Sequence, residues 1–469
     1  MKKIHICIAA VAALVLGSCN KFDEDININP NIPSRATGTQ LIANAQLFLP
    51  GLSASPQGEF NAQYLAETQY PGASLYPDGG TSFYGLYQGP LMNLEAVIKS
   101  NSLSGNEGPI SNQIAVAKIL KAYFFWHITD RWGDVPYTDA LKGSADFTPK
   151  YDPQSVIYDS LFRLLKDANA MIVPGAILHD IVYRGDMNKW KRLSNTIRML
   201  MALRLSEVDA TRASAEFNSA LNADGGIMTS NADNLMFKHL ADANNQNYWY
   251  GQVVNQNREW WALTETLVNY MNPVNDPRLA VYGKKNNAGI YKGLEYGTTV
   301  GLPNTTGVSL MGPAIYAQDA AIHLVTYAQA LFAKAEAAKR GWIPGGDAAA
   351  KTNYDLAVTE SIRQWTGSTT GAAALLATPE VQYNPARAME QIGMQRYVHL
   401  FMHGYEAWAE WRRTGYPNNL VTPGGRAIPT RNSYPPNELF NNADNYREAV
   451  QRQFAGQDNL YGKVWWDKP

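Results

Sequence analysis

The chain has 469 residues, with 40 Lys and Arg against 41 Asp and Glu, so its net charge at pH 7 is -1 and its pI is about 6.7. This balance argues against a surface for nucleic acid or an anionic membrane, because both need clustered positive charge. With two cysteines the chain is not a disulfide scaffold, and its length is ample for a large apolar core.

The N-terminal segment has the parts of a secretory signal. Lys2 and Lys3 form a positive end, residues 4–16 are apolar, and the run Leu16-Gly17-Ser18-Cys19 places small residues before a cysteine. The apolar stretch is too short to span a bilayer. Residues 1–18 are therefore predicted to be a removable leader that resembles those of bacterial lipoproteins, in which Cys19 would become the acylated N-terminus. An ordinary signal peptide with a chance cysteine is the alternative.

Residues 19–35 are predicted to be a tether. The acidic run 20–25 is typical of a solvated linker, and it also resembles the short signal that sends certain lipoproteins to the cell surface. Pro30 and Pro33 disfavour helix in the residues before them, so the tether should be extended. The globular body is expected to form a single domain over residues 36–469.

Beyond the tether, apolar residues recur mostly at helical intervals and strand-like alternation is confined to short pieces, so the fold class is predicted to be mainly α. The expected helices cover residues 114–132, 156–172, 187–208, 211–221, 319–340, 347–365 and 388–414. Asp152 and Pro153 are expected to cap and open the second of them. Gly341, Gly367 and Gly415 stand where three of them should end.

Three of the expected helices space small or apolar residues by four and then by three. The sets are Leu161, Leu165 and Ala168; Ala213, Phe217 and Ala220; and Ala350, Tyr354 and Ala357. This spacing is typical of the second helix of a tetratricopeptide unit, although any amphipathic helix shows something similar. Its recurrence in paired helices favours repeat units over about 114–222 and 319–414. Large insertions are expected at about 49–88, 224–259 and 275–313.

Several longer motifs follow one another along the chain. They are Thr129-Asp130-Arg131-Trp132-Gly133-Asp134-Val135-Pro136-Tyr137; Gly185-Asp186-Met187-Asn188-Lys189-Trp190; Asn275-Asp276-Pro277-Arg278-Leu279; Thr326-Tyr327-Ala328-Gln329-Ala330; and Gly404-Tyr405-Glu406-Ala407-Trp408 continuing to Gly415-Tyr416-Pro417. In order and rough spacing they resemble the SusD/RagB-type outer-membrane nutrient-binding lipoproteins, in the SusD-like branch. The resemblance runs from Cys19 almost to Pro469.

This resemblance implies tetratricopeptide-like helix pairs in a right-handed superhelical scaffold with long, irregular ligand-binding insertions. It implies a protein lipid-anchored at the cell surface of the outer membrane that binds an oligosaccharide, or in some members a peptide. It also implies a partner, a TonB-dependent transporter of the SusC type, to which the nutrient is delivered. A surface glycoside hydrolase and a helical-repeat adaptor that binds only proteins stay open as alternatives.

The chain is rich in aromatic residues, with 12 Trp and 26 Tyr, and a flat ring beside polar groups suits the apolar face and hydroxyl rim of a sugar. Two segments combine rings with polar residues. The candidate ligand-binding residues are Tyr70, Tyr76, Tyr84, Tyr87 and Asn93 in the first, and Asn247, Trp249, Tyr250, Arg258, Trp260 and Trp261 in the second. The competing interpretation is that these rings anchor long loops to the helices.

No residue is predicted to be catalytic, to hold a metal or to bind a cofactor. Glu406 and Glu410 lie on one helix face, whereas the two carboxylates of a glycosidase must flank the scissile bond. His399, His403 and Glu406 have a spacing that suits a metal in principle, but no HExxH pattern accompanies them. P-loop and dinucleotide fingerprints are not found in the sequence either.

The aromatic and charged residues near the C-terminus are expected to be structural. Trp408 and Trp411 should pack in the core, while Glu410 and Arg413 should pair on the surface. The pair Trp465-Trp466 should hold the C-terminus against the body.

Cys19 is predicted to be the lipid attachment point. Cells grown with radiolabelled palmitate should label the wild-type protein but not Cys19→Ala, because the thiol is the acylation site. The wild-type protein should sediment with outer membranes, and the variant should move to the soluble fraction. An unlabelled wild-type chain free in the periplasm would contradict this prediction.

Overall fold

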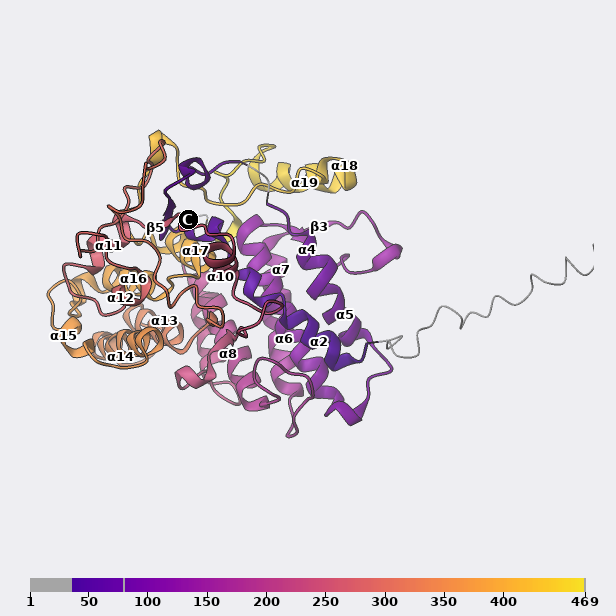
Figure 1. The fold of residues 1–469 in the computed structure, drawn as a ribbon. Coiled ribbons are helices and arrows are strands. Elements are labelled where there is room, and N and C mark those ends of the chain that lie inside the picture. Colours follow the sequence, from indigo (N-terminus) through magenta and orange to yellow (C-terminus); the bar gives the residue numbers. More distant parts are fainter. Residues whose placement is uncertain (1–35, 79–80, 468–469) are drawn as a thin grey trace, which may run out of the picture.

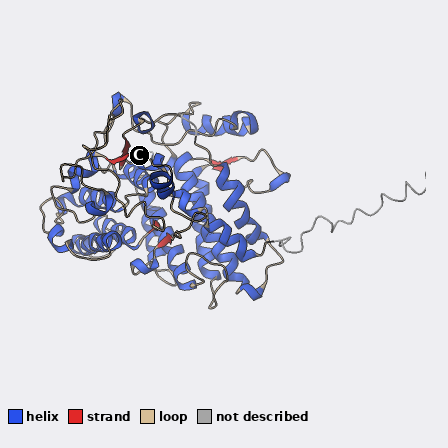
Figure 2. Cartoon of the chain, viewed as in Figure 1, coloured by secondary structure: helices blue, strands red, loops and turns tan. Residues whose placement is uncertain are grey.

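The computed structural model describes residues 36–78 and 81–467 and is mainly helical (Figures 1 and 2). Its helices are α2 (Gly38–Gln46), α3 (Pro56–Asn61), α4 (Tyr84–Leu86), α5 (Met92–Lys99), α6 (Ile110–Trp132), α7 (Gln154–Met171), α8 (Met187–Arg204), α9 (Ala210–Leu221), α10 (Tyr248–Tyr250), α11 (Glu265–Met271), α12 (Leu279–Tyr282), α13 (Tyr327–Lys339), α14 (Gly346–Thr366), α15 (Ala372–Leu376), α16 (Ala388–His399), α17 (Gly404–Thr414), α18 (Glu438–Asn441) and α19 (Ala443–Phe454). Within these ranges no helix combines the length and apolar character needed to cross a bilayer. The predicted leader, the tether and Cys19 lie outside the described residues.

The strands of the described chain form antiparallel pairs, and two of the pairs join segments that are distant in sequence. The pairs are β1 (Leu65–Glu67) with β5 (Trp261–Leu263), β2 (Val135–Pro136) with β3 (Tyr151–Asp152), and β4 (Leu235–Phe237) with β6 (Ile322–Val325). In the first pair Leu65 lies opposite Leu263 and Glu67 opposite Trp261. The predicted insertion at about 49–88 is therefore tied by backbone hydrogen bonds to the strand that follows the predicted insertion at about 224–259.

The long helices pack as pairs, which confirms the tetratricopeptide-like scaffold. α6 packs on α7, α8 on α9, α13 on α14, and α16 on α17. Figure 1 shows α5, α6 and α7 at one end of the molecule and α13 to α16 at the other. All nine residues of the three predicted spacing sets are completely buried. Small side chains at these positions let the paired helices approach, as the spacing predicts.

Two expected helices are interrupted. Segment 319–340 starts as strand β6, because residues 322–325 pair with β4, and becomes α13 only after Thr326 and Gln329 form a capping box. Segment 388–414 is two helices, because the chain turns at residues 400–403, where Met402 has a φ of 63°. The period of apolar residues does not reveal either break.

The start of α7 also differs from the prediction. The helix begins at Gln154, with Pro153 as its N-cap residue. Asp152 does not cap the helix. Its carboxylate accepts hydrogen bonds from the backbone N–H groups of Tyr137 and Thr138, at 3.0 and 2.8 Å, and so closes the turn after β2.

An aromatic core holds the insertions against α16 and the turn that follows it. Tyr64 stacks on Tyr397, with 4.5 Å between ring centroids, and Tyr282 stacks on Phe401 at 4.1 Å. Trp249 belongs to the same apolar cluster and is completely buried. Most rings of the insertions are therefore packing residues, which is the competing interpretation of the aromatic segments.

The aromatic residues of α17 and the C-terminus pack as predicted. Trp408 is completely buried and donates from Nε1 to the carbonyl oxygen of Pro429 at 2.7 Å. Trp466 donates from Nε1 to Asp130 Oδ1 at 2.8 Å. Trp411 is half-buried. The last described residues are thus fastened to helix α6.

A buried arginine–carboxylate network joins five helices. Its members are Asp130 on α6, Arg204 on α8, Glu336 on α13, Arg396 on α16, and Glu406, Glu410 and Arg413 on α17. The guanidinium of Arg204 contacts Asp130 at 3.0 Å and Glu406 at 2.7 Å, and it also pairs with Glu410. Arg204 has no exposed surface, so these carboxylates replace its hydration.

The second half of the network surrounds two glutamates. Arg413 contacts Glu336 and Glu410, both at 2.7 Å, and Arg396 bridges the same two carboxylates. Burial raises the pKa of Glu410, but the charges of Arg413, Arg396 and Arg204 outweigh it and lower the pKa to about 2. The pairing of Glu410 with Arg413 is confirmed, whereas its predicted surface location is wrong. Helices α13 and α16 cover it, which the local sequence does not show.

We expect Glu410→Gln to lower the free energy of unfolding by about 3–5 kcal/mol, because loss of one carboxylate charge leaves buried guanidinium groups uncompensated. Urea unfolding at pH 7 measures this change. The matched control is Glu448→Gln, because Glu448 also pairs with an arginine but is exposed on α19. Its effect should stay below about 1 kcal/mol. Equal effects of both substitutions would contradict the importance of the network.

Candidate functional site

The pairing of β1 with β5 brings one residue of each predicted aromatic segment together. Tyr70 follows β1 and Trp260 immediately precedes β5, and their rings meet edge to face with 5.2 Å between centroids. Tyr70 is 59% exposed and Trp260 is half-buried. The backbone N–H of Thr68 donates to the carbonyl oxygen of Trp260 at 2.8 Å, which fixes the two loops relative to each other.

A cation completes this group. The guanidinium of Arg258 lies over the ring of Trp260, 5.2 Å from its centroid, and is held by a 2.9 Å hydrogen bond from Nη1 to Gln252 Oε1. We call Tyr70, Arg258 and Trp260 the ring platform. Burial raises the pKa of nearby Glu67, and the charge of Arg258 opposes that rise. Exposed ring faces beside hydrogen-bond donors suit a ligand with an apolar face and a hydroxyl rim.

Four other candidates are buried, so they do not belong to the ring platform. Tyr76 is 3% exposed and its hydroxyl accepts a hydrogen bond from Gln63 Nε2 at 2.7 Å. Asn247 caps α10 by accepting from the backbone N–H of Trp249 at 2.8 Å. Trp249 and Trp261 pack edge to face inside the core of the insertions, at 5.2 Å. Their side chains therefore stabilise the loops.

The remaining candidates make no ring contact or hydrogen bond with the ring platform in the described part of the chain, and three of them bind other parts of the scaffold. The hydroxyl of Tyr84 donates to Glu438, and that of Tyr87 donates to the carbonyl oxygen of Pro136 at 2.5 Å. Asn93 on α5 donates to Asn44 Oδ1 on α2 at 2.8 Å. Tyr250 is half-buried on α10. The structure thus unites three of the eleven candidates, the exposed Tyr70 and the half-buried Arg258 and Trp260, in one group.

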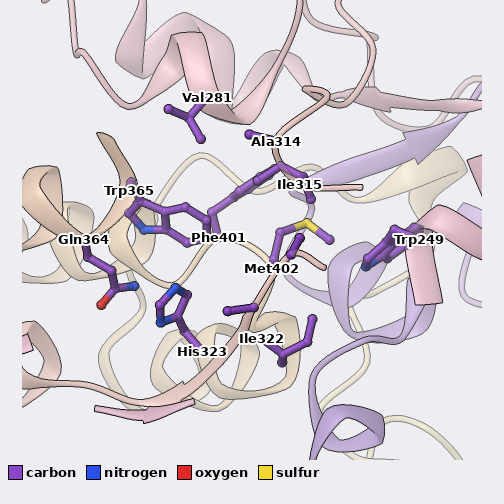
Figure 3. A pocket seen from close by; sticks show the side chains of 12 residues that line it. Trp249, Val281, Ala314, Ile315, Ile322, His323, Gln364, Trp365, Phe401 and Met402 are labelled. Atoms are coloured by element: carbon purple, nitrogen blue, oxygen red, sulfur yellow. The ribbon is translucent and has the colours of Figure 1, made fainter. Parts of the chain in front are cut away.

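A recessed pocket of about 170 Å³ lies between β6, the end of α14 and the turn at residues 401–402 (Figure 3). Trp365, Gln364 and His323 form one end of it, and Trp249 lies at the other end (Figure 3). The rings of His323 and Trp365 meet at 5.7 Å. We call this the Trp365 pocket.

Aromatic contacts connect the pocket with the platform. Trp249 contacts Trp261 at 5.2 Å, and Trp261 contacts Trp260 of the ring platform at 6.1 Å. His323, Gln364 and Trp365 are not among the residues predicted from the sequence to bind a ligand. His323 stands alone in a short strand and Trp365 ends a helix, so neither position carries a pattern that indicates ligand binding. The fold alone brings them together.

Three of the groups considered for catalysis or metal binding, Glu406, Glu410 and His399, contact other residues of the scaffold. Glu406 and Glu410 both contact Arg204, so they do not face each other across a cleft. His399 forms hydrogen bonds with Thr326 Oγ1 at 2.7 Å and Ser361 Oγ at 2.9 Å. Across residues 36–78 and 81–467, no three His, Cys, Asp or Glu side chains gather in a way that could hold a metal ion.

Comparison with protein families gives one extensive match. The SusD-like_2 family model, described as "Starch-binding associating with outer membrane", matches residues 30–435. No curated protein matches the chain.

Solved structures with the same fold cover nearly all of the chain. A chitin-binding protein is 29% identical, with a TM-score of 0.79 over 92% of this chain and 100% of that chain. A SusD homolog from Bacteroides fragilis is 25% identical, with a TM-score of 0.80 over 92% and 100%. A chitin-binding SusD homolog from Flavobacterium johnsoniae is 22% identical, with a TM-score of 0.77 over 92% and 98%, and this likeness concerns the fold alone.

The two indoles should respond differently to truncation. We expect Trp249→Ala to lower the free energy of unfolding by about 3–5 kcal/mol, because the completely buried ring leaves a cavity. Trp260→Ala should lower it by less than about 1 kcal/mol, because that ring is partly exposed. Chemical denaturation of both variants measures the difference. A large loss in Trp260→Ala would show that this ring is a core residue.

Proposed function

The chain belongs to the SusD-like family of nutrient-binding outer-membrane proteins, and we propose that it binds an oligosaccharide at the cell surface and delivers it to a TonB-dependent transporter of the SusC type. In this proposal Cys19 carries the lipid anchor and the helix pairs form a rigid frame for the ligand-binding loops. The protein captures its ligand and performs no chemistry on it.

The observation that carries the proposal is the ring platform. Tyr70 and Trp260 come from segments far apart in the chain, and the β1–β5 pairing holds them together at the surface. Most other rings of the insertions are buried or half-buried, and Tyr70, at 59% exposed, is more exposed than Tyr248 at 37%. A stacking surface with an adjacent guanidinium matches the apolar face and hydroxyls of a sugar.

An exposed platform also suits delivery. Shallow contacts with two rings give modest affinity and fast dissociation, whereas a deep, water-excluding cleft would retain the ligand. Oligosaccharides of N-acetylglucosamine are the first ligands to test, because the 29% identical protein with the same fold is described as chitin-binding.

Calorimetric titration of the purified protein against chitin, starch and cellulose oligosaccharides and a peptide panel tests the proposal. At least one oligosaccharide should bind saturably and be recovered intact. Trp260→Ala should raise its Kd about fivefold to tenfold, because one stacking contact is lost. Phe147→Ala removes a ring that is 78% exposed elsewhere, and should leave the Kd unchanged.

Other results would assign a different function to the protein. Shortened products in the titration mixture would identify a hydrolase. Saturable binding of peptides alone would identify a peptide-binding member of the family. Binding of neither class would contradict the proposal and leave a protein-binding adaptor.

A further inference from the structure

The Trp365 pocket differs from the ring platform in size and depth. Its volume of about 170 Å³ is smaller than the roughly 300–1,000 Å³ of clefts that enclose a whole drug-sized ligand. The same volume far exceeds the roughly 10–15 Å³ that a single water requires. The pocket therefore suits one substituent of a ligand and not a complete sugar chain.

The wall of the pocket carries no formal charge. No Asp, Glu, Lys or Arg is found among the described residues that line it. Burial lowers the pKa of His323 to about 4, so the imidazole is neutral at pH 7. A carboxylate, phosphate or ammonium group would lose its hydration here without a counter-charge. The occupant should be uncharged.

Two polar side chains, those of Gln364 and His323, lie at one end of the pocket beside Trp365 (Figure 3). Gln364 Oε1 accepts a hydrogen bond from Asn234 Nδ2 at 3.0 Å, and this orients the amide so that its NH2 lies on the side of His323 (Figure 3). His323 Nδ1 is buried and has no hydrogen-bond partner in the described part of the chain. One oriented donor thus lies beside a ring nitrogen that donates or accepts according to its tautomer.

The remaining side chains of the wall are mainly apolar, apart from the Nε1–H of Trp249, which is buried and has no hydrogen-bond partner in the described part of the chain. Ile315, Ile322 and Met402 contribute aliphatic and thioether surface. Trp365 and Phe401 contribute rings at 6.1 Å from each other, and the N–H of Trp365 already donates to the carbonyl oxygen of His399 at 3.1 Å. A sugar ring brings several hydroxyls, and each hydroxyl left unpaired in this environment costs about 1–3 kcal/mol. A small amide has one C=O, one N–H and a methyl group, which these walls can match.

We propose that the Trp365 pocket binds the acylamino group of an N-acylated sugar. Gln364 donates to the carbonyl oxygen of this group, His323 forms the second hydrogen bond to its amide, and the methyl group packs against Phe401. The assignment rests on the proposed function, since the pocket recognises one substituent of the oligosaccharide that the protein captures.

A matched pair of ligands tests the assignment. Chito-oligosaccharides and cello-oligosaccharides of equal length share the same β1,4-linked backbone and differ in whether position 2 carries an acetamido group or a hydroxyl. Calorimetry on the wild-type protein should give a Kd about tenfold lower for the chito-oligosaccharide, because the hydrogen bonds to the amide are then made.

Gln364→Glu removes the donor while its carboxylate can still accept from Asn234. It should bring the ratio of the two Kd values to about one, through a rise in the Kd of the chito-oligosaccharide. Gln382→Glu makes the same change at an exposed site and should preserve the ratio. If Gln364→Glu fails to fold, His323→Phe, which keeps a ring but removes Nδ1, should abolish the same preference.

The outcomes separate this inference from the proposed function. Equal Kd values for both ligands in the wild-type protein would overturn the acylamino assignment. The proposed function as an oligosaccharide-binding protein would be unaffected. A preference that survives both Gln364→Glu and His323→Phe would also overturn the assignment. Failure of every oligosaccharide to bind would overturn the proposed function and the assignment together.

Discussion

Buried charge is the constraint on which the scaffold depends. Arg204 and Arg413 expose almost no surface, and their partners come largely from other helices. An uncompensated charge in the interior costs several kcal/mol, so displacement of α8, α13, α16 or α17 relative to its neighbours would be strongly unfavourable. Apolar contacts between helix pairs are less specific, because similar side chains repack after a small shift. The arginine–carboxylate network therefore determines how the helix pairs meet.

The position of the ring platform follows from that scaffold. The short helix α3 lies against α17 so closely that a Cβ atom on Gly404 would be 2.2 Å from the carbonyl carbon of Gly58. Glu59 accepts a hydrogen bond from the backbone N–H of Gly404 at 2.9 Å, which attaches the insertion to the first turn of α17. Strand β1 follows α3 directly and pairs with β5. The interface between α3 and α17 thus fixes β1, and through β1 and β5 it fixes the positions of Tyr70 and Trp260.

Sequence reasoning was most successful where local periodicity reports on burial. The spacing of Ala350, Tyr354 and Ala357 predicted both a helix and its buried face, because i, i+4 and i+7 positions lie on one side of any helix. It was less successful in the insertions, where a tyrosine in a polar loop can be exposed like Tyr70 or buried like Tyr76 with a hydrogen-bonded hydroxyl. Both environments suit a ring with a polar edge, so residue type does not distinguish them.

The amino-acid sequence by itself determined the mainly helical class, the paired helices and the family motifs, because these depend on contacts between residues close along the chain. Tertiary structure alone decided which rings remain exposed and which polar groups meet. The pairing of β1 with β5 selects Tyr70 and Trp260, and the arrangement of β6 beside α14 places His323 next to Trp365. These contacts join residues that are many positions apart in the chain. They depend on how whole helices and strands pack, and local sequence patterns do not encode that packing.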